Sequence, residues 1–467
     1  MSRYRPPFVH PYIPNSAPEV FDAMLDAVGV KEIDELFEAV PEHLRSGHER
    51  LAMAGPYLAE ADLWRHLSSV LKKNKHTDDY VCFLGGGAAK HYVPAVCDEL
   101  VKKPEFYSAF LGYETSDPGK HQVWWEYQSM LCDLLEMEIT GWGSHCGATA
   151  ASSAILMAGR LNAGRPEALL PGNLSPDRRS VIHEVCRAVL DIKYVAMDPE
   201  TGLLDMDDYK AKLSDRTAVV YLENPTYLGG IEHRAGELCK LAHDCGALVA
   251  VSVNPISLGL LETPRKYGAD IACGDMQPCG IHLQYGGGNL GFVACPDHER
   301  YANAYPFMLV SATTTTNPGE QGYAVPNFET SSYSLREKAG DITSTNAMLW
   351  TVAAGAYLAQ MGPRGMREIG ETIIANTHYA KQRLAAVKGI RVLFSSTPFM
   401  EFVVCFDDSG KQVKQVNKAL LDHGIFGGHD ISKEYPSLGQ SALYCFTEMI
   451  SKQDIDHLAG ALEEVLR

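Results

Sequence analysis

The 467-residue chain is acidic, with 41 Lys and Arg against 58 Asp and Glu and a formal net charge of −17. This balance argues against a nucleic-acid partner, because binding to phosphates requires a basic face. Hydrophobic residues make up 46% of the chain and charged residues 21%, which is typical of a globular rather than a disordered protein. No run of about 18 apolar residues occurs, so we expect no membrane-spanning helix. Because the first residues also lack the apolar segment of a signal peptide, we expect a cytoplasmic protein.

The twelve cysteines are scattered, and none of them forms a C-x-x-C pair. Several, such as Cys405 and Cys445, lie between apolar neighbours, as small buried hydrophobic residues do. We therefore expect free thiols in a reducing compartment and no metal site.

Residues 1–75 predict short helices with too few apolar residues for a core of their own. Ser16 and Glu19 form a capping-box pattern, which predicts a helix that begins at Ser16 and ends near Gly29. A second short helix is predicted at residues 31–37. We expect this segment to be a helical arm that packs on a larger body or on a neighbouring subunit.

From about residue 80 to 300, short apolar runs alternate with helical patterns and glycine turns. The predicted strands are residues 181–183, 217–222, 247–251 and 270–272. Continuous apolar strands that are joined by helices are typical of a parallel sheet covered on both faces. Residues 76–325 are therefore predicted to form a large α/β domain with a mostly parallel sheet.

After residue 340 the pattern changes to helices followed by shorter strands. The predicted helices are residues 344–360, 365–387, 413–423 and 452–466, and the predicted strands are residues 390–394, 401–406 and 442–446. Residues 326–467 are therefore predicted to form a smaller C-terminal α+β domain.

A large α/β domain followed by a small α+β domain is the organisation of fold-type-I enzymes that use pyridoxal phosphate (PLP). Their site needs an anion cup at a helix N-terminus for the phosphate. It also needs a strand-end carboxylate for the pyridine nitrogen and a lysine for the Schiff base. Only the first of these three has a candidate in this sequence.

The candidate anion cup lies at residues 144–149, directly before a helical run to residue 161. Gly147 would let the backbone approach an anion closely, and Thr149 could add a hydroxyl group. On this motif alone, an ordinary glycine-containing helix start is an equally good interpretation.

The other two requirements are not met in the sequence. Ser252 stands near the end of a predicted strand, where the carboxylate is expected, and serine supplies no negative charge. Gln277 and Pro278 stand where the lysine should follow the next strand. Three lysines near these segments in sequence are better explained as solvated surface charges: Lys90, Lys266 and Lys338. We expect the body of a PLP enzyme that has no Schiff-base lysine of its own.

Strings along nearly the whole chain carry a family resemblance. They include Phe83-Leu84-Gly85-Gly86-Gly87, Asn254-Pro255-Ile256-Ser257-Leu258 and Gly427-Gly428-His429-Asp430, together with residues 91–96, 126–128, 222–226, 274–281 and 434–439. On these strings the sequence resembles the P-protein family of the glycine cleavage system, and within it the α subunits of split glycine dehydrogenases (decarboxylating).

The resemblance implies an oxidoreductase subunit of PLP-dependent transferase fold type I. The implied reaction is decarboxylation of glycine, with transfer of the aminomethyl group to the lipoyl arm of H-protein. The resemblance also implies that a β subunit holds the PLP and its lysine, while the α subunit completes the active site at the α–β interface. An α subunit would be inactive alone, and no catalytic residue is assigned to this chain.

Several residues in or beside these strings are candidates for the site. The candidate substrate-pocket or interface residues are Tyr113, Glu114, His91, Tyr92, Arg336 and Lys338, and the candidate cofactor-binding residues are Gly147 and Thr149. Arg336 and Lys338 would face the lipoyl channel or a carboxylate. For every candidate, a structural role such as core packing or a salt bridge is the alternative.

Some segments depart from the family pattern, namely residues 88–90, 110–117, 329–332 and 340–345. These departures favour one alternative, a subunit of a PLP complex that acts on a different amino acid. Two further alternatives stay open: a non-catalytic regulatory or scaffold subunit, and a self-sufficient PLP enzyme with an unexpected lysine.

Overall fold

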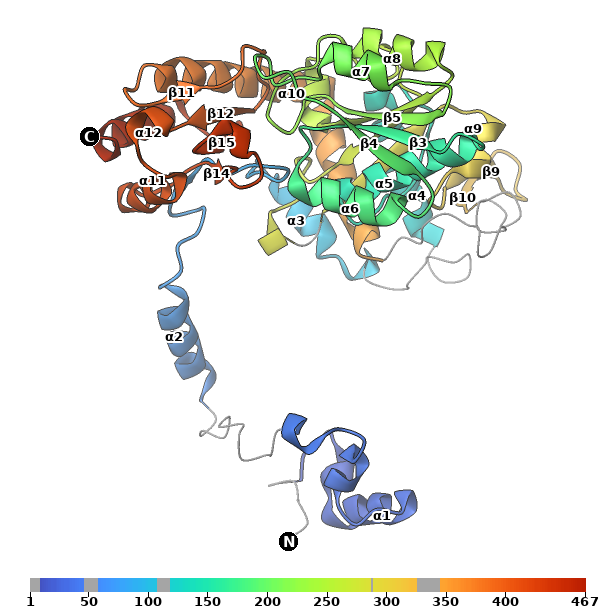
Figure 1. Cartoon of the computed structure of the whole chain (residues 1–467). Helices are drawn as coiled ribbons and strands as arrows, with labels where there is room; N and C mark the ends of the chain where they lie inside the picture. Colours follow the sequence, from blue (N-terminus) through green and yellow to red (C-terminus); the bar gives the residue numbers. More distant parts are fainter. Residues whose placement is uncertain (1–8, 46–57, 107–117, 287–288, 326–344) are drawn as a thin grey trace. The chain divides into compact units, whose positions relative to one another are not determined.

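The computed structural model describes residues 9–45, 58–106, 118–286, 289–325 and 345–467 (Figure 1). The chain divides into two units, Met1–Lys75 and His76–Arg467. Among the helices of the described residues, none is both long enough and apolar enough to cross a membrane.

The first unit begins with the helix α1 (Pro18–Val28), which ends at Gly29 in the left-handed conformation with φ 82°. The end of this helix is as predicted, because glycine adopts that conformation without steric cost. The predicted cap at Ser16 is wrong. The Ser16 hydroxyl instead donates to the carbonyl of Ile13 at 2.7 Å, at the end of the 3-10 helix η1 (Pro14–Ser16). The helix α1 therefore begins at Pro18, with Ala17 as its N-cap.

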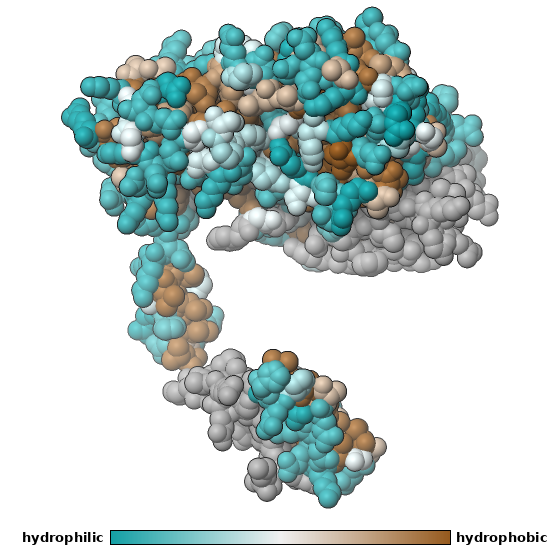
Figure 2. All heavy atoms as spheres, viewed as in Figure 1, coloured by the Kyte–Doolittle hydropathy of each residue, from teal (hydrophilic) through white to brown (hydrophobic). Residues whose placement is uncertain are grey.

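The rest of the first unit holds the short 3-10 helices η2 (Ile33–Phe37) and η3 (Glu42–Leu44) and the helix α2 (Glu60–Leu71). The apolar side chains of α2 are exposed, with Trp64 at 73%. Figure 2 shows them as a continuous hydrophobic stripe along this helix. An apolar stripe of this kind on one helix face is typical of a helix that packs against another surface.

The second unit is built on a seven-stranded sheet with the order β2-β8-β7-β6-β5-β3-β4. Its strands are β2 (Ile139–Thr140), β3 (Glu167–Pro171), β4 (Asp191–Val195), β5 (Thr217–Glu223), β6 (Leu248–Val253), β7 (Ile271–Asp275) and β8 (Gly291–Cys295). The five strands from β3 to β7 pair in parallel, and β8 pairs antiparallel with both β7 and β2. The prediction of a mostly parallel sheet is confirmed.

Helices cover both faces of this sheet (Figure 1). Alternate residues of β5 face opposite ways. Val220 and Leu222 pack with α4 (Pro118–Leu135), α8 (Ala235–Asp244) and α10 (Thr345–Ala385), while Val219 and Tyr221 pack with α5 (Gly147–Leu161). Burial on both faces explains why this strand is apolar throughout. Other elements of this region are the helices α3 (Ala95–Val101), α7 (Met206–Lys212) and α9 (Glu299–Ala304) and the hairpin of β9 (Ser311–Thr314) and β10 (Gln321–Ala324).

The strand predicted at residues 181–183 is wrong, because these residues belong to the helix α6 (Pro176–Cys186). Ser175 caps α6 by accepting from the Arg178 N–H at 3.1 Å, and Pro176 occupies the first turn. Of residues 181–183, only Ile182 is buried. An N-cap serine followed by proline is a stronger signal than so short an apolar run.

A four-stranded antiparallel sheet with the order β11-β12-β15-β14 forms the C-terminal part. Its strands are β11 (Arg391–Val392), β12 (Glu401–Cys405), β14 (His429–Asp430) and β15 (Ser441–Cys445). The helices α11 (Val413–Leu420) and α12 (Lys452–Val465) pack on it. The strand β1 (Val81–Cys82) pairs with β13 (Ile425–Phe426) and so joins the start of the unit to this part. The predicted domain boundary at residue 326 lies outside the described residues.

The helix α10 (Thr345–Ala385) runs between the two sheets and contains a break at Gly362, where φ is 55°. Pro363 follows directly and removes a backbone donor. The two helices predicted at residues 344–360 and 365–387 correspond to the two halves of α10.

Candidate functional site

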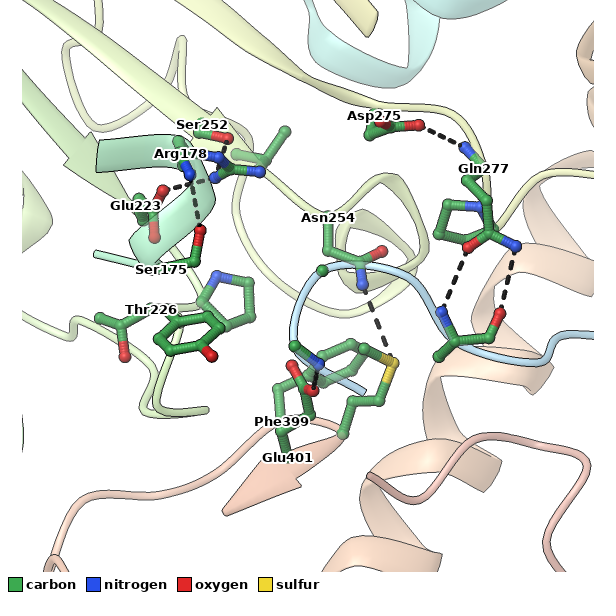
Figure 3. A pocket seen from close by; sticks show the side chains of 18 of the residues that line it. Ser175, Arg178, Glu223, Thr226, Ser252, Asn254, Asp275, Gln277, Phe399 and Glu401 are labelled. Carbon is green, nitrogen blue, oxygen red and sulfur yellow. Dashed lines mark hydrogen bonds and ion pairs between the residues drawn. The ribbon is translucent and has the colours of Figure 1, made fainter. Parts of the chain in front are cut away.

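A cavity of about 100 Å³ lies at the carboxyl ends of β5, β6 and β7 (Figure 3). This edge is where open α/β sheets bind their ligands. Two further segments, residues 86–91 and 399–401, close the cavity. The lining residues are Gly86, Gly87, Ala89, His91, Ser175, Arg178, Glu223, Pro225, Thr226, Tyr227, Ser252, Val253, Asn254, Asp275, Gln277, Pro278, Phe399, Met400 and Glu401.

A buried ion pair between Arg178 and Glu223 lies in one wall. The guanidinium Nη1 donates to a carboxylate oxygen of Glu223, and Tyr221 donates to the same oxygen at 3.0 Å. Burial alone would lower the pKa of Arg178, but the charge of Glu223 outweighs it and raises that pKa. The guanidinium is therefore a permanent positive charge in this wall.

Two local features place this pair. Arg178 lies in the first turn of α6, which Ser175 caps. Glu223 and Ser252 are paired neighbours at the ends of β5 and β6. The Ser252 hydroxyl accepts from Arg178 Nη1 at 3.2 Å, so the position where a PLP enzyme has its pyridine carboxylate here contacts a cation.

The N-terminus of α5, where the sequence predicts an anion cup, meets the Asp275 carboxylate from the end of β7. One oxygen accepts from the Gly147 N–H at 2.7 Å, and the other accepts from the N–H groups of Gln277 at 2.9 Å and Leu290 at 3.4 Å. Burial raises the pKa of Asp275, although these hydrogen bonds lower it. A Cβ on Gly147 would lie 3.1 Å from both Arg178 Nη2 and Asp275 Cβ, so a side chain here would crowd both groups.

Thr149 closes the same helix end with its own side chain. Its hydroxyl accepts from the Cys146 N–H at 3.1 Å and lies within 2.8 Å of the Cys146 carbonyl, to which it donates. Both residues that the sequence analysis assigns to an anion cup are therefore engaged with groups of this chain.

Glu401 lies in the opposite wall, at the start of β12 (Figure 3). One carboxylate oxygen accepts from the Gly86 N–H at 2.7 Å. The residue is only 8% exposed, and burial raises the pKa of its carboxyl to about 7. Near neutral pH this carboxyl group is therefore close to half protonated.

Gln277 fixes the segment that closes the cavity. Its side-chain amide accepts from the Ala89 N–H at 3.3 Å and donates to the Ala89 carbonyl at 3.1 Å. The residue that stands near the expected lysine position is 1% exposed. It acts as a clamp between the residues after β7 and residues 86–91.

His91 and Tyr92 have different surroundings. His91 lines the cavity, and its Nδ1 lies 2.9 Å from Glu448, whereas the Tyr92 side chain is half exposed and its N–H donates to Glu448 at 2.7 Å. Burial alone would raise the pKa of Glu448, but the contact with His91 outweighs it and lowers that pKa. The structure brings His91 into the site, and Tyr92 contributes through its backbone.

Four of the sequence candidates, Tyr113, Glu114, Arg336 and Lys338, lie outside the described residues. The polar groups that sequence reasoning missed are Arg178, Glu223, Asp275, Glu401 and Glu448. Of these residues, Glu401 has a local signal in the sequence, because it is an acidic residue at the start of an otherwise apolar run. In the described part of the chain, no group of three or more His, Cys, Asp and Glu side chains could hold a metal ion.

The model of the glycine cleavage system P-protein family matches residues 10–462 of this chain. The chain belongs to this family. It is 35% identical to the probable glycine dehydrogenase (decarboxylating) subunit 1 of Staphylothermus marinus, over 98% of each chain. It is 34% identical to the protein of the same description from Listeria monocytogenes, over 97% of this chain and 99% of the relative.

Two solved structures have a fold similar to that of this chain. A crystal structure of glycine decarboxylase (P-protein) of the glycine cleavage system, in inhibitor-bound form, superposes with a TM-score of 0.81 at 30% identity, covering 98% of this chain and 100% of the other. Sphingosine-1-phosphate lyase of Burkholderia pseudomallei has a TM-score of 0.63 at 16% identity over 90% of this chain and 92% of the other, a likeness of fold alone. The prediction of PLP-dependent fold type I is confirmed.

Proposed function

We propose that this chain is the α subunit of a glycine decarboxylase. In this proposal it completes the active site of a β subunit that holds PLP, and the complex decarboxylates glycine and transfers the aminomethyl group to the lipoyl arm of H-protein. Membership of the P-protein family and the subunit 1 description of its relatives support the proposal. The observation that carries it is the Asp275 carboxylate at the N-terminus of α5.

The residues of this cavity do not fit PLP. Asp275 takes the helix end that a phosphate would need, and Ser252 supplies no negative charge. Among the described residues that line this cavity of about 100 Å³ there is no lysine, and ligand sites usually measure about 300–1,000 Å³. We therefore propose that this chain does not bind PLP and that the partner subunit holds the cofactor.

The contribution of this chain is then to shape and shield a site that the β subunit carries. Tyr113, Glu114, Arg336 and Lys338 are our candidates for side chains that reach the shared pocket or the lipoyl channel. These assignments rest on the family resemblance of the sequence. A water-excluding wall strengthens the electrostatic interactions in a neighbouring site.

The isolated chain tests the proposal directly. We expect the purified chain, mixed with PLP and reduced with borohydride, to show no modified lysine by mass spectrometry. We also expect decarboxylation of labelled glycine only after the β subunit and lipoylated H-protein are added. A PLP–lysine adduct on this chain, or turnover without a second subunit, would contradict the proposal.

A second candidate function keeps the complex and changes the amino acid. The departures of residues 110–117 and 329–332 from the family pattern favour it. Release of CO₂ from a panel of amino acids by the reconstituted complex separates the two candidates. Exclusive reaction with glycine eliminates the second one.

A further inference from the structure

We propose that the cavity bounded by Arg178 and Glu401 binds one small free α-amino acid as a zwitterion, without a covalent bond and without PLP. The ligand carboxylate would contact Arg178, and its ammonium group would contact Glu401. The described residues that line it belong to this chain, and we propose it as a ligand site in addition to the cofactor site that we assign to the partner.

The size of the cavity restricts the ligand. A volume of about 100 Å³ lies below the roughly 300–1,000 Å³ of ordinary ligand sites. We therefore expect a small ligand, and glycine and alanine are the smallest amino acids.

Arg178 supplies the cationic end. Every side-chain hydrogen bond that it makes to described residues uses Nη1, with Glu223, Tyr221 and Ser252 as acceptors. Nε and Nη2 make none with the described part of the chain, and 20% of the side chain is exposed. Two adjacent guanidinium donors match the two oxygens of a carboxylate.

Glu401 supplies the anionic end. Figure 3 shows it across the cavity from Arg178, on the β12 side. Its Oε1 accepts from Gly86, whereas Oε2 has no hydrogen-bond partner among the described residues. No cation lies within ion-pair distance of this carboxylate in the described part of the chain, whereas Glu223 pairs with Arg178 and Glu448 contacts His91. An ammonium group beside Oε2 would provide the missing counter-charge.

Two unpaired polar atoms in the lining point to the same ligand. The Thr226 hydroxyl and His91 Nε2 are buried and have no hydrogen-bond partner among the described residues. His91 Nδ1 lies 2.9 Å from Glu448, so Nε2 is the ring nitrogen that is left for a ligand. Buried polar atoms without a partner are rare in native proteins, and a small polar ligand accounts for both.

The charges of the cavity favour a zwitterion over a simple anion or a simple amine. Glu223 already balances Arg178, while Asp275 and Glu401 add further carboxyl groups. A simple anion would leave Oε2 of Glu401 without a donor, and a simple amine would leave the spare donors of Arg178 unused. A zwitterion satisfies both ends without changing the net charge of the site.

Calorimetric titration of the full-length chain without PLP tests this inference. We expect glycine to bind with one site per chain and alanine to bind more weakly, while acetate, methylamine and leucine give at least about tenfold weaker binding because each lacks one end or exceeds the volume. No heat with glycine overturns the proposal, and so does equal affinity for glycine and acetate or for glycine and methylamine.

Variants separate the site from the fold. Glu401→Gln keeps the acceptor for Gly86 and removes the charge, and Arg178→Lys keeps the charge and removes the planar pair of donors; each is expected to weaken glycine binding at least about tenfold. The matched controls on the exposed face of α6 are Glu184→Gln and Arg187→Lys, which should bind as the parent chain does. Unchanged binding in both site variants overturns the proposal. A failure here leaves the borohydride test of PLP location unaffected, so the two proposals fail separately.

Discussion

At the scale of single residues, the charged side chains of the cavity differ in the partners that they have within the chain. Asp275 accepts from three backbone N–H groups, and Arg178 is held by Glu223 and two hydroxyl groups. Glu401 has one backbone donor. The charge of Arg178 is therefore balanced by Glu223, whereas Glu401 has no counter-charge among the described residues, and the predictions for the two positions differ.

Removing the acid of the ion pair should leave a buried cation uncompensated. We expect Glu223→Gln to lower the free energy of unfolding by about 3–5 kcal/mol, measured by urea denaturation. Adding Arg178→Met to it should recover a large part of this loss, since the unpaired charge is then gone. The exposed pair of Glu184 with Arg187 on α6 is the control, and Glu184→Gln there should cost about 0.5 kcal/mol or less. Equal costs at the two sites would contradict the assignment.

Glu401 should make stability depend on pH. Its carboxyl has a pKa of about 7 in the folded chain against 4.5 in the unfolded one, so the folded state binds more protons between these values. The stabilisation is complete below pH 4.5 and is lost as the pH rises through 7, by up to about 3 kcal/mol. We expect Glu401→Gln to lack this loss and to be more stable than the parent chain at pH 8. A difference between the two chains that does not vary with pH would refute this.

At the scale of elements, α6 decides where the cation of the cavity lies. Its cap, Ser175, accepts from the N–H of Arg178 and so fixes the first turn. The helix end therefore carries both a stabilising hydrogen bond and a residue of the site.

Removing this cap should weaken the whole helix. We expect Ser175→Ala to lower the free energy of unfolding by about 1 kcal/mol, with Ser180→Ala on the exposed side of α6 as the matched control. Because Arg178 loses its fixed turn, heat release on glycine titration should also fall in Ser175→Ala. A cost no larger than that of the control would show that the cap hydrogen bond is not what positions α6.

The same elements show how far the sequence predicts the fold. Strands β5, β6 and β7 are continuous apolar runs and were predictable, because both faces are buried. The strands β3 and β4 were missed. β3 carries Glu167 and Pro171 at its ends, and β4 alternates polar and apolar residues as an edge strand does. Local pattern therefore identifies central strands better than those near the edge.

The site was harder to predict than the fold. Gly147 and Thr149 were recognisable because a helix start has a local signature. Arg178, Glu223 and Asp275 come from separate elements, and only the order of strands in the sheet brings them together. A single sequence holds no record of that apposition.

At the scale of the whole molecule, the buried apolar clusters of the described residues all belong to residues 76–467. The first unit has Leu25 as its one buried apolar side chain in the described part. We infer that the second unit holds the stability of the chain, while the apolar stripe of α2 is available for a partner surface.

Deleting residues 1–75 tests this inference. We expect the remaining chain to unfold within about 4 °C of the parent chain in calorimetry, the shift that about 1 kcal/mol produces in a large domain. We also expect weaker co-purification with the β subunit, and the double variant Leu63→Glu and Leu67→Glu in the full chain should weaken it likewise. A large fall in the unfolding temperature would instead mean that the arm packs on the body of its own chain.

The hydrogen bond from Gly86 to Glu401 joins positions 315 residues apart, and β1 pairs with β13 over a similar span. During synthesis, chains fold from the N-terminus as complete segments emerge. Residues 86–91 therefore leave the ribosome long before the strand that holds them has been made. The large sheet can assemble while translation continues, but the cavity closes only once nearly the entire polypeptide is available, which makes a finished site a marker of a finished chain.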